Sequence, residues 1–222
     1  MIDAGLVVFD LDGTLIDSSV DLANAVNALL GDLGVSPLPD PAIVAMVGEG
    51  AAVLVRRALT AAGLDPETPG ALERFLSHYN AHLLDNTRPY PGMVETLTEL
   101  AKHIPLAVLT NKPAGATTRI LEGLGLLRYF RKAIGGDSAF GRKPDPAGLK
   151  FLAQTASVSA ARALLVGDSP VDLATARNAG AQICLARYGF GYRFSVADFQ
   201  RDEQIIDSPD ELPGAAAVLL DD

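Results

Sequence analysis

The sequence contains no tryptophan, only three histidines and a single cysteine among its 222 residues. One cysteine, Cys184, excludes a disulfide within the chain, which fits a reducing compartment and predicts a cytoplasmic protein. Cys184 stands in an apolar run, so we interpret it as a small buried hydrophobe. His78 and His82 have a spacing that can bind a metal, but no third ligand lies nearby in the sequence, so they do not predict a zinc site.

Long apolar runs and an excess of positive charge are also missing. No apolar stretch approaches the roughly 18 residues of a membrane span, and no basic residue precedes the first apolar run, as a secretory signal requires. The 18 basic residues are outnumbered by 27 acidic ones, which gives a formal net charge of −9. The sequence therefore predicts neither nucleic acid nor membrane as a partner. A small anionic substrate stays compatible, because a bound metal or a local cation can reverse the field at one point.

Hydrophobic residues make up 49% of the chain, enough for one medium domain or for a core with a small inserted module. Four short runs rich in Val, Ile, Leu and Ala show no alternation, which is typical of parallel strands covered on both faces. Helical spacings lie between these runs. The sequence therefore predicts an α/β fold with a doubly wound, mainly parallel, Rossmann-like sheet. The predicted strands span residues 6–9, 106–109, 163–166 and 182–185.

The stretch from about residue 16 to about residue 86 contains no convincing strand and instead shows several helical patterns. Ser18 or Ser19 is a plausible N-cap for the first of these helices, and Asp40 for the next. Two prolines in the segment 88–92 favour an extended hinge where the chain returns to the sheet. We predict a catalytic core domain formed by residues 1–15 and 87–222, with an all-helical cap domain at residues 16–86.

Two carboxylates, Asp10 and Asp12, follow the first apolar run directly, in the segment Asp10-Leu11-Asp12-Gly13-Thr14. Ligands of open α/β sheets bind just beyond the carboxyl ends of the strands. Neighbouring carboxylates repel each other unless a cation joins them, and Mg²⁺ with oxygen ligands is typical of phosphate chemistry. Taken alone, the segment is also explained by a solvated turn that caps a helix.

Three further segments carry residue types that suit a phosphoryl site. Thr110, Asn111 and Lys112 supply a hydroxyl, an amide and a cation that can donate hydrogen bonds to a phosphoryl group. Lys143, held between turns, can supply a counter-charge. Asp168 and Asp172 would face the same side if the second lay in the first turn of a helix. Each segment alone is explained about as well by a turn or a helix cap. Because all belong to one edge of one predicted sheet, together they indicate a phosphoryl-transfer site.

The order of these motifs resembles the haloacid dehalogenase-like superfamily, in the branch that inserts a helical cap after the first strand. The likeness covers essentially the whole chain, and within the superfamily it is nearest to the phosphoglycolate phosphatases. The residues that carry this nearer likeness are Val47-Gly48-Glu49-Gly50-Ala51, Tyr90-Pro91-Gly92, Thr110-Asn111-Lys112-Pro113, Gly135-Gly136-Asp137 and Tyr188-Gly189.

The resemblance implies a Mg²⁺-dependent phosphatase that converts a small phosphate monoester, most nearly 2-phosphoglycolate, to the alcohol and phosphate. Asp10 would be the nucleophile that forms an aspartyl-phosphate, and Asp12 the general acid and then the general base. Thr110, Asn111 and Lys143 would hold the phosphoryl oxygens. The helical cap would close over the substrate and exclude bulk water.

The resemblance also implies the ligands of Mg²⁺. These would be Asp10, the main-chain carbonyl of Asp12, and Asp168. The residues expected close behind the ligands are Asp172, Ser169 and Thr14.

In the cap, Gly48, Glu49 and Arg56 are the residues expected to face the substrate. Glu49 departs from the family's usual pattern, in which a neutral polar residue often stands between the two glycines. A carboxylate at this position would disfavour a substrate that carries its own carboxylate, unless Arg56 or another cation offsets it.

Three other interpretations stay open on the sequence alone. One is a phosphatase of a bulkier phosphosugar, such as N-acetylmuramic acid 6-phosphate, and another is a phosphosugar mutase that uses the same aspartyl-phosphate. The third is a non-catalytic binding protein, which we would expect to have lost Asp10, Asp12, Lys143 or Asp168. A monomer and a homodimer are both compatible with the sequence.

Overall fold

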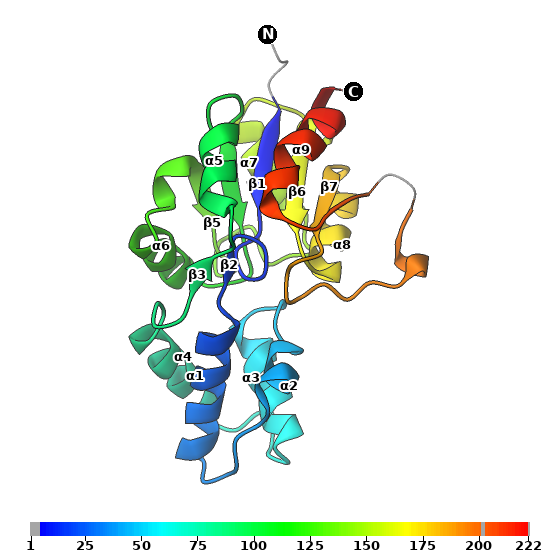
Figure 1. Cartoon of the computed structure of the whole chain (residues 1–222). Coiled ribbons are helices and arrows are strands. Elements are labelled where there is room, and N and C mark those ends of the chain that lie inside the picture. Colours follow the sequence, from blue (N-terminus) through cyan, green and yellow to red (C-terminus); the bar gives the residue numbers. More distant parts are fainter. Residues whose placement is uncertain (1–4, 201–202, 222) are drawn as a thin grey trace.

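The computed structural model describes residues 5–200 and 203–221, and its centre is a parallel sheet (Figure 1). The strands of this sheet are β1 (Leu6–Phe9), β4 (Leu106–Leu109), β5 (Phe130–Ile134), β6 (Ala163–Gly167), β7 (Gln182–Ala186) and β8 (Gln204–Ile206). They lie in the order β5-β4-β1-β6-β7-β8, and every neighbouring pair is parallel. The predicted doubly wound α/β fold is confirmed.

Helices cover both faces of the sheet. The helices of this part are α5 (Met93–Leu100), α6 (Ala114–Gly123), α7 (Ala147–Thr155), α8 (Pro170–Ala179) and α9 (Leu212–Asp221). Figure 1 shows α5 and α9 in front of the sheet and α7 and α8 behind it. Val7 and Phe9 belong to the core cluster shared with α5, α6 and α9, whereas Leu6 and Val8 belong to the cluster shared with α7 and α8. Both faces of β1 are therefore apolar, which is why its sequence shows no alternation.

The four predicted strands are confirmed, with one more residue at the end of β6 and of β7. Strands β5 and β8 were not predicted from the sequence. Both lie at the edges of the sheet, where a strand has a partner on one side only. Arg131 and Lys132 of β5 are exposed, so this strand lacks the continuous apolar run of the central strands.

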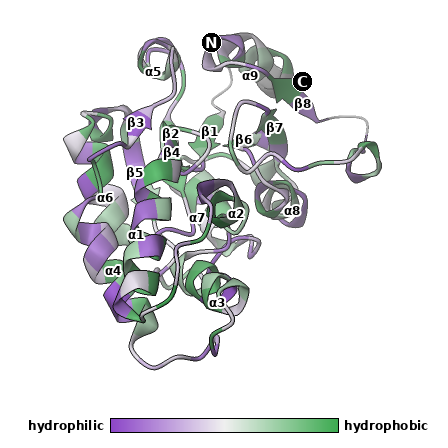
Figure 2. Cartoon of the chain, turned by 60° about the horizontal axis from the view of Figure 1, so that its bottom comes forward, coloured by the Kyte–Doolittle hydropathy of each residue, from purple (hydrophilic) through white to green (hydrophobic). Residues whose placement is uncertain are grey.

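A helical segment interrupts the chain between two short strands, β2 (Ile16–Asp17) and β3 (Arg88–Pro89), which pair with each other antiparallel. Its helices are α1 (Ser19–Asp32), α2 (Asp40–Val44), α3 (Ala51–Ala61) and α4 (Ala71–Ala81). Figure 2 shows α1 beside α4, with α2 and α3 on the other side of the segment. Asp40, predicted as an N-cap, is instead the first residue of α2, and Pro39 occupies the capping position. The division into core and cap domains at these boundaries stays a prediction.

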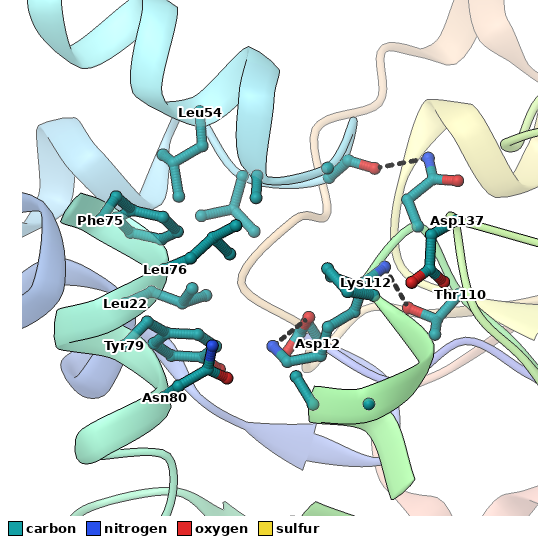
Figure 3. A pocket seen from close by; sticks show the side chains of 18 of the residues that line it. Asp12, Leu22, Leu54, Phe75, Leu76, Tyr79, Asn80, Thr110, Lys112 and Asp137 are labelled. Carbon is teal, nitrogen blue, oxygen red and sulfur yellow. Dashed lines mark hydrogen bonds and ion pairs between the residues drawn. The ribbon is translucent and has the colours of Figure 1, made fainter. Parts of the chain in front are cut away.

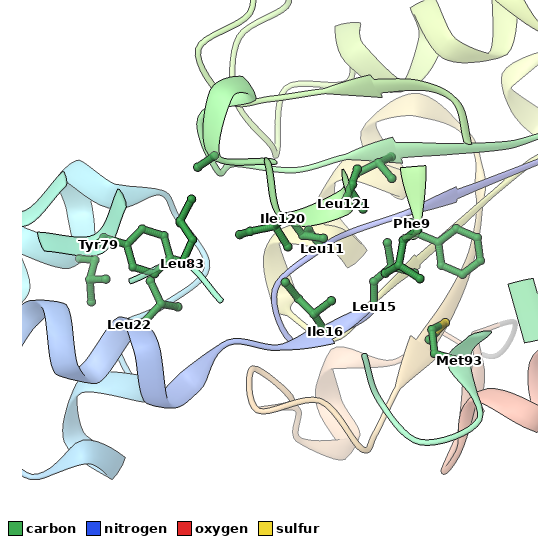
Figure 4. Close-up of a cluster of buried hydrophobic side chains, with 14 of the residues drawn as sticks. Phe9, Leu11, Leu15, Ile16, Leu22, Tyr79, Leu83, Met93, Ile120 and Leu121 are labelled. Atoms are coloured by element: carbon green, nitrogen blue, oxygen red, sulfur yellow. The ribbon is translucent and has the colours of Figure 1, made fainter. Parts of the chain in front are cut away.

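One hydrophobic cluster runs from the sheet into the helical segment. Figure 4 shows Phe9, Leu15 and Ile16 on the sheet side of this cluster and Leu22 and Tyr79 on the helical side. All of these side chains are buried. The apolar packing therefore holds α1 and α4 close to the carboxyl end of β1. Within residues 5–200 and 203–221, every helix is too short or too polar to cross a lipid bilayer.

Candidate active site

Three neighbouring strands end in polar side chains at the same edge of the sheet. Asp10 follows β1, Thr110 follows β4 and Asp168 follows β6. The ladder hydrogen bonds continue into these residues, because the amide of Asp10 donates to Val166 at 2.9 Å and that of Thr110 donates to Ile134 at 3.0 Å. The rigid sheet therefore fixes the backbone from which the side chains project.

Lys143, in the loop after β5, reaches the same point of the sheet edge. Its Nζ lies 2.8 Å from Oδ1 of Asp10 and 2.6 Å from Oδ1 of Asp172. Burial opposes the positive charge of Lys143, but these two carboxylates outweigh it and raise the pKa of the ammonium group above its usual range. Lys143 therefore stays charged, as a counter-charge for a phosphoryl group requires.

Asn111 holds the backbone of Lys143 in place. Its Oδ1 accepts a hydrogen bond of 2.8 Å from the Lys143 amide, and its Nδ2 donates at 3.1 Å to the Lys143 carbonyl. The same Nδ2 also donates at 3.1 Å to the carbonyl of Gly48 in the helical segment. Since the side chain of Asn111 is engaged in these contacts, its main-chain N–H is the group left for the predicted phosphoryl contact.

Asp10, Asp168 and Asp172 form a buried acidic cluster. Each offers one carboxylate oxygen, and these three oxygens lie within 4.8 Å of one another. Oδ1 of Asp10 is buried without a hydrogen bond of good geometry, although Lys143 lies close to it as an ion pair. Buried oxygens of this kind suit a hard divalent cation, so the residues present fit the Mg²⁺ that the sequence predicts. The identity of the ion stays a prediction.

The protonation of this cluster follows from its burial. Burial raises the pKa of Asp10 to about 6, and the neighbouring carboxylate of Asp172 acts in the same direction, against the attraction of Lys143. Burial, together with Asp172 and Asp10, also raises the pKa of Asp168 well above its usual value. Both carboxylates would ionise more readily beside a bound cation.

Close backbone packing surrounds Asp168. A Cβ atom on Gly13 would lie 2.0 Å from Oδ2 of Asp168, and one on Gly189 would lie 2.6 Å from the same oxygen. The amide of Gly191 donates to this oxygen at 2.7 Å, and Oγ1 of Thr14 donates to Oδ1 at 3.2 Å. The orientation of Asp168 is therefore fixed by hydrogen bonds from Gly191 and Thr14 and by the close approach of Gly13 and Gly189. The role of Thr14 close behind the metal ligands stays a prediction.

Asp172 and Ser169 form a capping box at the start of α8. The amide and hydroxyl of Ser169 donate to Oδ2 of Asp172 at 3.1 and 2.6 Å, and the Asp172 amide donates back to the Ser169 hydroxyl. The other oxygen of Asp172 accepts from Lys143. Of the two N-caps that the sequence offered, Asp168 and Ser169, the structure has Ser169. The carboxylate of Asp172 takes part both in this cap and in the ion pair with Lys143.

Asp12 faces a second lysine, Lys112, which the sequence offered as a donor to the phosphoryl group. Nζ of Lys112 donates to both carboxylate oxygens of Asp12 at 2.8 Å, and the Ser18 hydroxyl donates to Oδ1 at 2.6 Å. Lys112 also lies over the ring of Tyr79, 4.6 Å from its centroid. Burial lowers the pKa of Lys112, but the effect of Asp12 and Tyr79 is larger and raises this pKa above its usual range. The available signal was its position inside the segment Thr110-Asn111-Lys112-Pro113.

A pocket of about 440 Å³ opens beside Asp10 and Asp12, between the sheet edge and the helical segment (Figure 3). Apolar side chains of the helical segment, among them Leu54, Phe75 and Leu76, face Asp12 and Lys112 across this space. The pocket is therefore polar on the side of the sheet and apolar on the side of the helices. It suits a small ligand with one polar end.

The predicted cap residues are only partly at this pocket. Gly48 lines it, but Glu49 and Arg56 are absent from its lining. Glu49 forms an ion pair with Arg57, and Arg56 forms one of 2.8 Å with Glu67, both on exposed surface. Further lining residues that the sequence did not single out are Tyr79, Asn80, Ala116 and Arg119.

Comparison with known proteins identifies the family of this chain. The family model of the haloacid dehalogenase-like hydrolases matches residues 7–186. A phosphoglycolate phosphatase from Rhodospirillum rubrum is 45% identical over 192 residues, which cover 83% of this chain and 80% of that protein. A phosphoglycolate phosphatase from Pseudomonas fluorescens is 42% identical over 229 aligned positions, which cover 98% of this chain and 83% of that protein.

A solved structure extends the likeness to the whole fold. The crystal structure of a predicted phosphoglycolate phosphatase from Haemophilus somnus superposes on this chain with a TM-score of 0.88 and 31% sequence identity, covering 97% of this chain and 99% of the other. The family match includes the helical segment and the strand ends that carry Asp10, Thr110 and Asp168. The chain therefore belongs to the haloacid dehalogenase-like hydrolases.

Proposed function

We propose that this hydrolase is a phosphoglycolate phosphatase, which cleaves 2-phosphoglycolate into glycolate and phosphate through an aspartyl-phosphate on Asp10. The observation that carries the proposal is the meeting of Asp10, Lys143 and Asp168 at one sheet edge, beside a pocket that also presents Asp12. The two curated relatives named above, both phosphoglycolate phosphatases, support the choice of substrate. A location in the cytoplasm, expected from the single cysteine, is part of the same proposal.

In the first half of the reaction, a carboxylate oxygen of Asp10 attacks the phosphorus atom while the bond to the ester oxygen breaks. Asp12 gives its proton to the leaving oxygen, so that glycolate departs as the alcohol. The hydroxyl of Thr110, the main-chain N–H of Asn111 and the ammonium group of Lys143 hold the phosphoryl oxygens. Thr110 and Asn111 line the pocket, and Lys143 lies behind Asp10.

In the second half, water attacks the phosphorus atom and the bond to Asp10 breaks, which releases inorganic phosphate and restores the free carboxylate. Asp12, now deprotonated, takes the proton of the attacking water. The apolar helical wall, with Leu54 and Phe75, limits the access of bulk water to the pocket. We infer that the helical segment of residues 16–86 acts as the cap domain of this site.

Mg²⁺ is the cation that we propose for the acidic cluster. Asp10, Asp168 and the main-chain carbonyl of Asp12 would hold it, and Asp172 would lie close behind. When bound, it would screen the repulsion between the substrate's phosphate and the attacking carboxylate.

The nucleophile is tested by Asp10→Asn, because an amide cannot form the aspartyl-phosphate. We expect phosphate release from 2-phosphoglycolate in the presence of Mg²⁺ to fall by at least about a thousandfold. Asp85→Asn, which changes an exposed carboxylate paired with His82, is the matched control and should keep full activity. Retained turnover in Asp10→Asn would contradict the proposed nucleophile.

The substrate is tested by a phosphate-release screen over small phosphate monoesters. We expect 2-phosphoglycolate to have the highest kcat/KM, above N-acetylmuramic acid 6-phosphate and hexose phosphates. An isomerised hexose phosphate, rather than free phosphate, would instead identify a mutase.

A further inference from the structure

The pocket beside Asp12 contains two cationic side chains, Lys112 and Arg119. Arg119 is exposed and donates from Nη2 to the carbonyl of Asn80 at 3.1 Å. Lys112 is only 6% exposed, and its ammonium group lies at the polar end of the pocket, between Asp12 and Tyr79. Among the residues that the structure describes as lining this pocket, Lys112 is thus the one buried cation.

Lys112 lies close to the position of the ester oxygen. The proposed acid, Asp12, must approach this oxygen to about 3 Å in order to protonate it. Nζ of Lys112 is 2.8 Å from both carboxylate oxygens of Asp12. Nζ therefore lies within about 6 Å of the ester oxygen, as the sum of two hydrogen-bond lengths. In 2-phosphoglycolate one methylene group separates the ester oxygen from the carboxylate, so that carboxylate falls within reach of Lys112.

Apart from Lys112 and the exposed Arg119, no residue described as lining the pocket can neutralise a carboxylate. Its helical wall is apolar, and the other charged groups at its base, Asp10, Asp12 and Asp137, are acidic. Bringing an anion next to such a wall is costly unless a cation pairs with it. Glu49, whose charge would oppose an acidic substrate, is held on exposed surface by Arg57 and is absent from the lining.

Lys112 can turn toward a substrate without leaving Asp12 unpaired. The Ser18 hydroxyl donates to Oδ1 of Asp12 at 2.6 Å, independently of Lys112. The lysine side chain has rotatable bonds and three N–H donors, so it can contact Asp12 and a substrate carboxylate at the same time. The ammonium group of Lys112 can therefore serve as the counter-charge of Asp12 and of the substrate carboxylate together.

We propose that Lys112 binds the carboxylate of the substrate and thereby selects phosphate monoesters that carry a carboxylate one carbon away from the ester oxygen. This inference rests on the proposed phosphatase function and specifies the group that sets its substrate class.

The test compares 2-phosphoglycolate with ethyl phosphate, which has the same ester bond and no carboxylate. We expect the wild-type protein to prefer 2-phosphoglycolate in kcat/KM, and Lys112→Met to reduce this preference by about tenfold or more, mainly through KM. Lys112→Arg, which keeps a cation, should retain part of the preference. Lys112→Gln is a second neutral variant if Lys112→Met does not fold, as judged by circular dichroism.

A binding assay separates this inference from the reaction itself. In the Asp10→Asn background with Mg²⁺, calorimetric titration should show tighter binding of 2-phosphoglycolate than of ethyl phosphate, and addition of Lys112→Met should remove the difference. If no monoester is hydrolysed by the wild type, the proposed function fails, whereas this assay still decides the role of Lys112.

Three outcomes would overturn the inference. In the first, Lys112→Met weakens both substrates equally, which would mean that Lys112 only supports Asp12. In the second, Arg119→Met abolishes the preference and Lys112→Met does not, which would assign the carboxylate to the exposed cation. The third outcome is a wild-type protein that shows no preference for 2-phosphoglycolate over ethyl phosphate in either assay. This outcome overturns the role of Lys112, whereas the proposed phosphatase activity is judged separately, by phosphate release from other monoesters.

Discussion

The ammonium group of Lys143 and the carboxylate of Asp172 lie 2.6 Å apart, and neither side chain is more than 1% exposed. The buried Asp172 thus holds the ammonium group of Lys143 in place, and the same ammonium group contacts Asp10. The same carboxylate caps α8 through Ser169, so helix α8 and the lysine share one anchor.

Asp172→Asn is expected to lower kcat about tenfold to a hundredfold with a smaller change in KM, because Lys143 loses the partner that orients it. Steady-state kinetics with 2-phosphoglycolate measure this effect. Asp198→Asn is the matched control, since Asp198 forms the same capping box with Ser195 on the surface. Equal kinetics for the two variants would contradict an orienting role of Asp172.

Asp10→Asn is expected to stabilise the metal-free protein at neutral pH. The pKa of Asp10 is about 6 in the folded protein against an ordinary value of 3.8, so the folded state binds more protons than the unfolded state between these values. Stability is therefore lost as the pH rises through this window, by up to about 3 kcal/mol at roughly 1.4 kcal/mol per pH unit. Thermal unfolding in EDTA should show a higher Tm for Asp10→Asn at pH 7.5, and no difference near pH 3.5.

Mg²⁺ is expected to raise the Tm of the wild type, and more strongly at pH 7.5 than at pH 5. The carboxylates of Asp10 and Asp168 must be ionised to bind a cation, and burial raises the pKa of both. The measurement is a titration of Tm with Mg²⁺ at both pH values. Asp168→Asn should greatly weaken the response, and an unchanged response in that variant would place the cation elsewhere.

Gly13→Ala is expected to destabilise the protein and to weaken Mg²⁺ binding about tenfold or more, because the new Cβ would displace Asp168. Gly34→Ala separates this clash from backbone strain, since Gly34 has a similar positive φ of 75° but open space around its Cβ position. The control should lose only about 1 to 2 kcal/mol in urea unfolding. A loss of the same size for Gly13→Ala, with unchanged Mg²⁺ affinity, would contradict the expectation.

Arg193→Met is expected to raise KM about fivefold while changing stability by less than about 1 kcal/mol. The Arg193 guanidinium, in the loop after β7, donates to the carbonyls of Val44 and Ala45 at the end of α2, and so links this loop to the helical segment. Arg187→Met is the control, because it breaks an exposed ion pair with Asp207 that does not involve the helical segment. If both variants raise KM equally, the link to α2 is not the cause.

The central strands and the sheet-edge residues were predictable because their signals are local. A strand that is buried on both faces needs an apolar run, and a polar residue directly after such a run lies at the carboxyl edge of the sheet. Asp10, Thr110 and Asp168 follow this rule. The edge strand β5 does not, because its exposed side tolerates charges such as Arg131.

The direction of side chains was not predictable from the same signals. Lys112 and Lys143 both lie in polar loops that follow strands, and only the fold decides that Lys143 meets Asp10 while Lys112 meets Asp12. Arg56 was expected at the substrate, but its position on α3 turns it toward Glu67 instead. A helix face can be read from spacing, whereas its orientation toward a pocket depends on packing between distant segments.

The paired strands β2 and β3 place the two ends of the helical segment next to each other, with Asp17 opposite Arg88. An insertion whose ends already meet adds little loop-closure entropy to the folding of the sheet. Because the chain leaves and re-enters the sheet at one two-stranded ribbon, the helical segment is a topologically self-contained insertion.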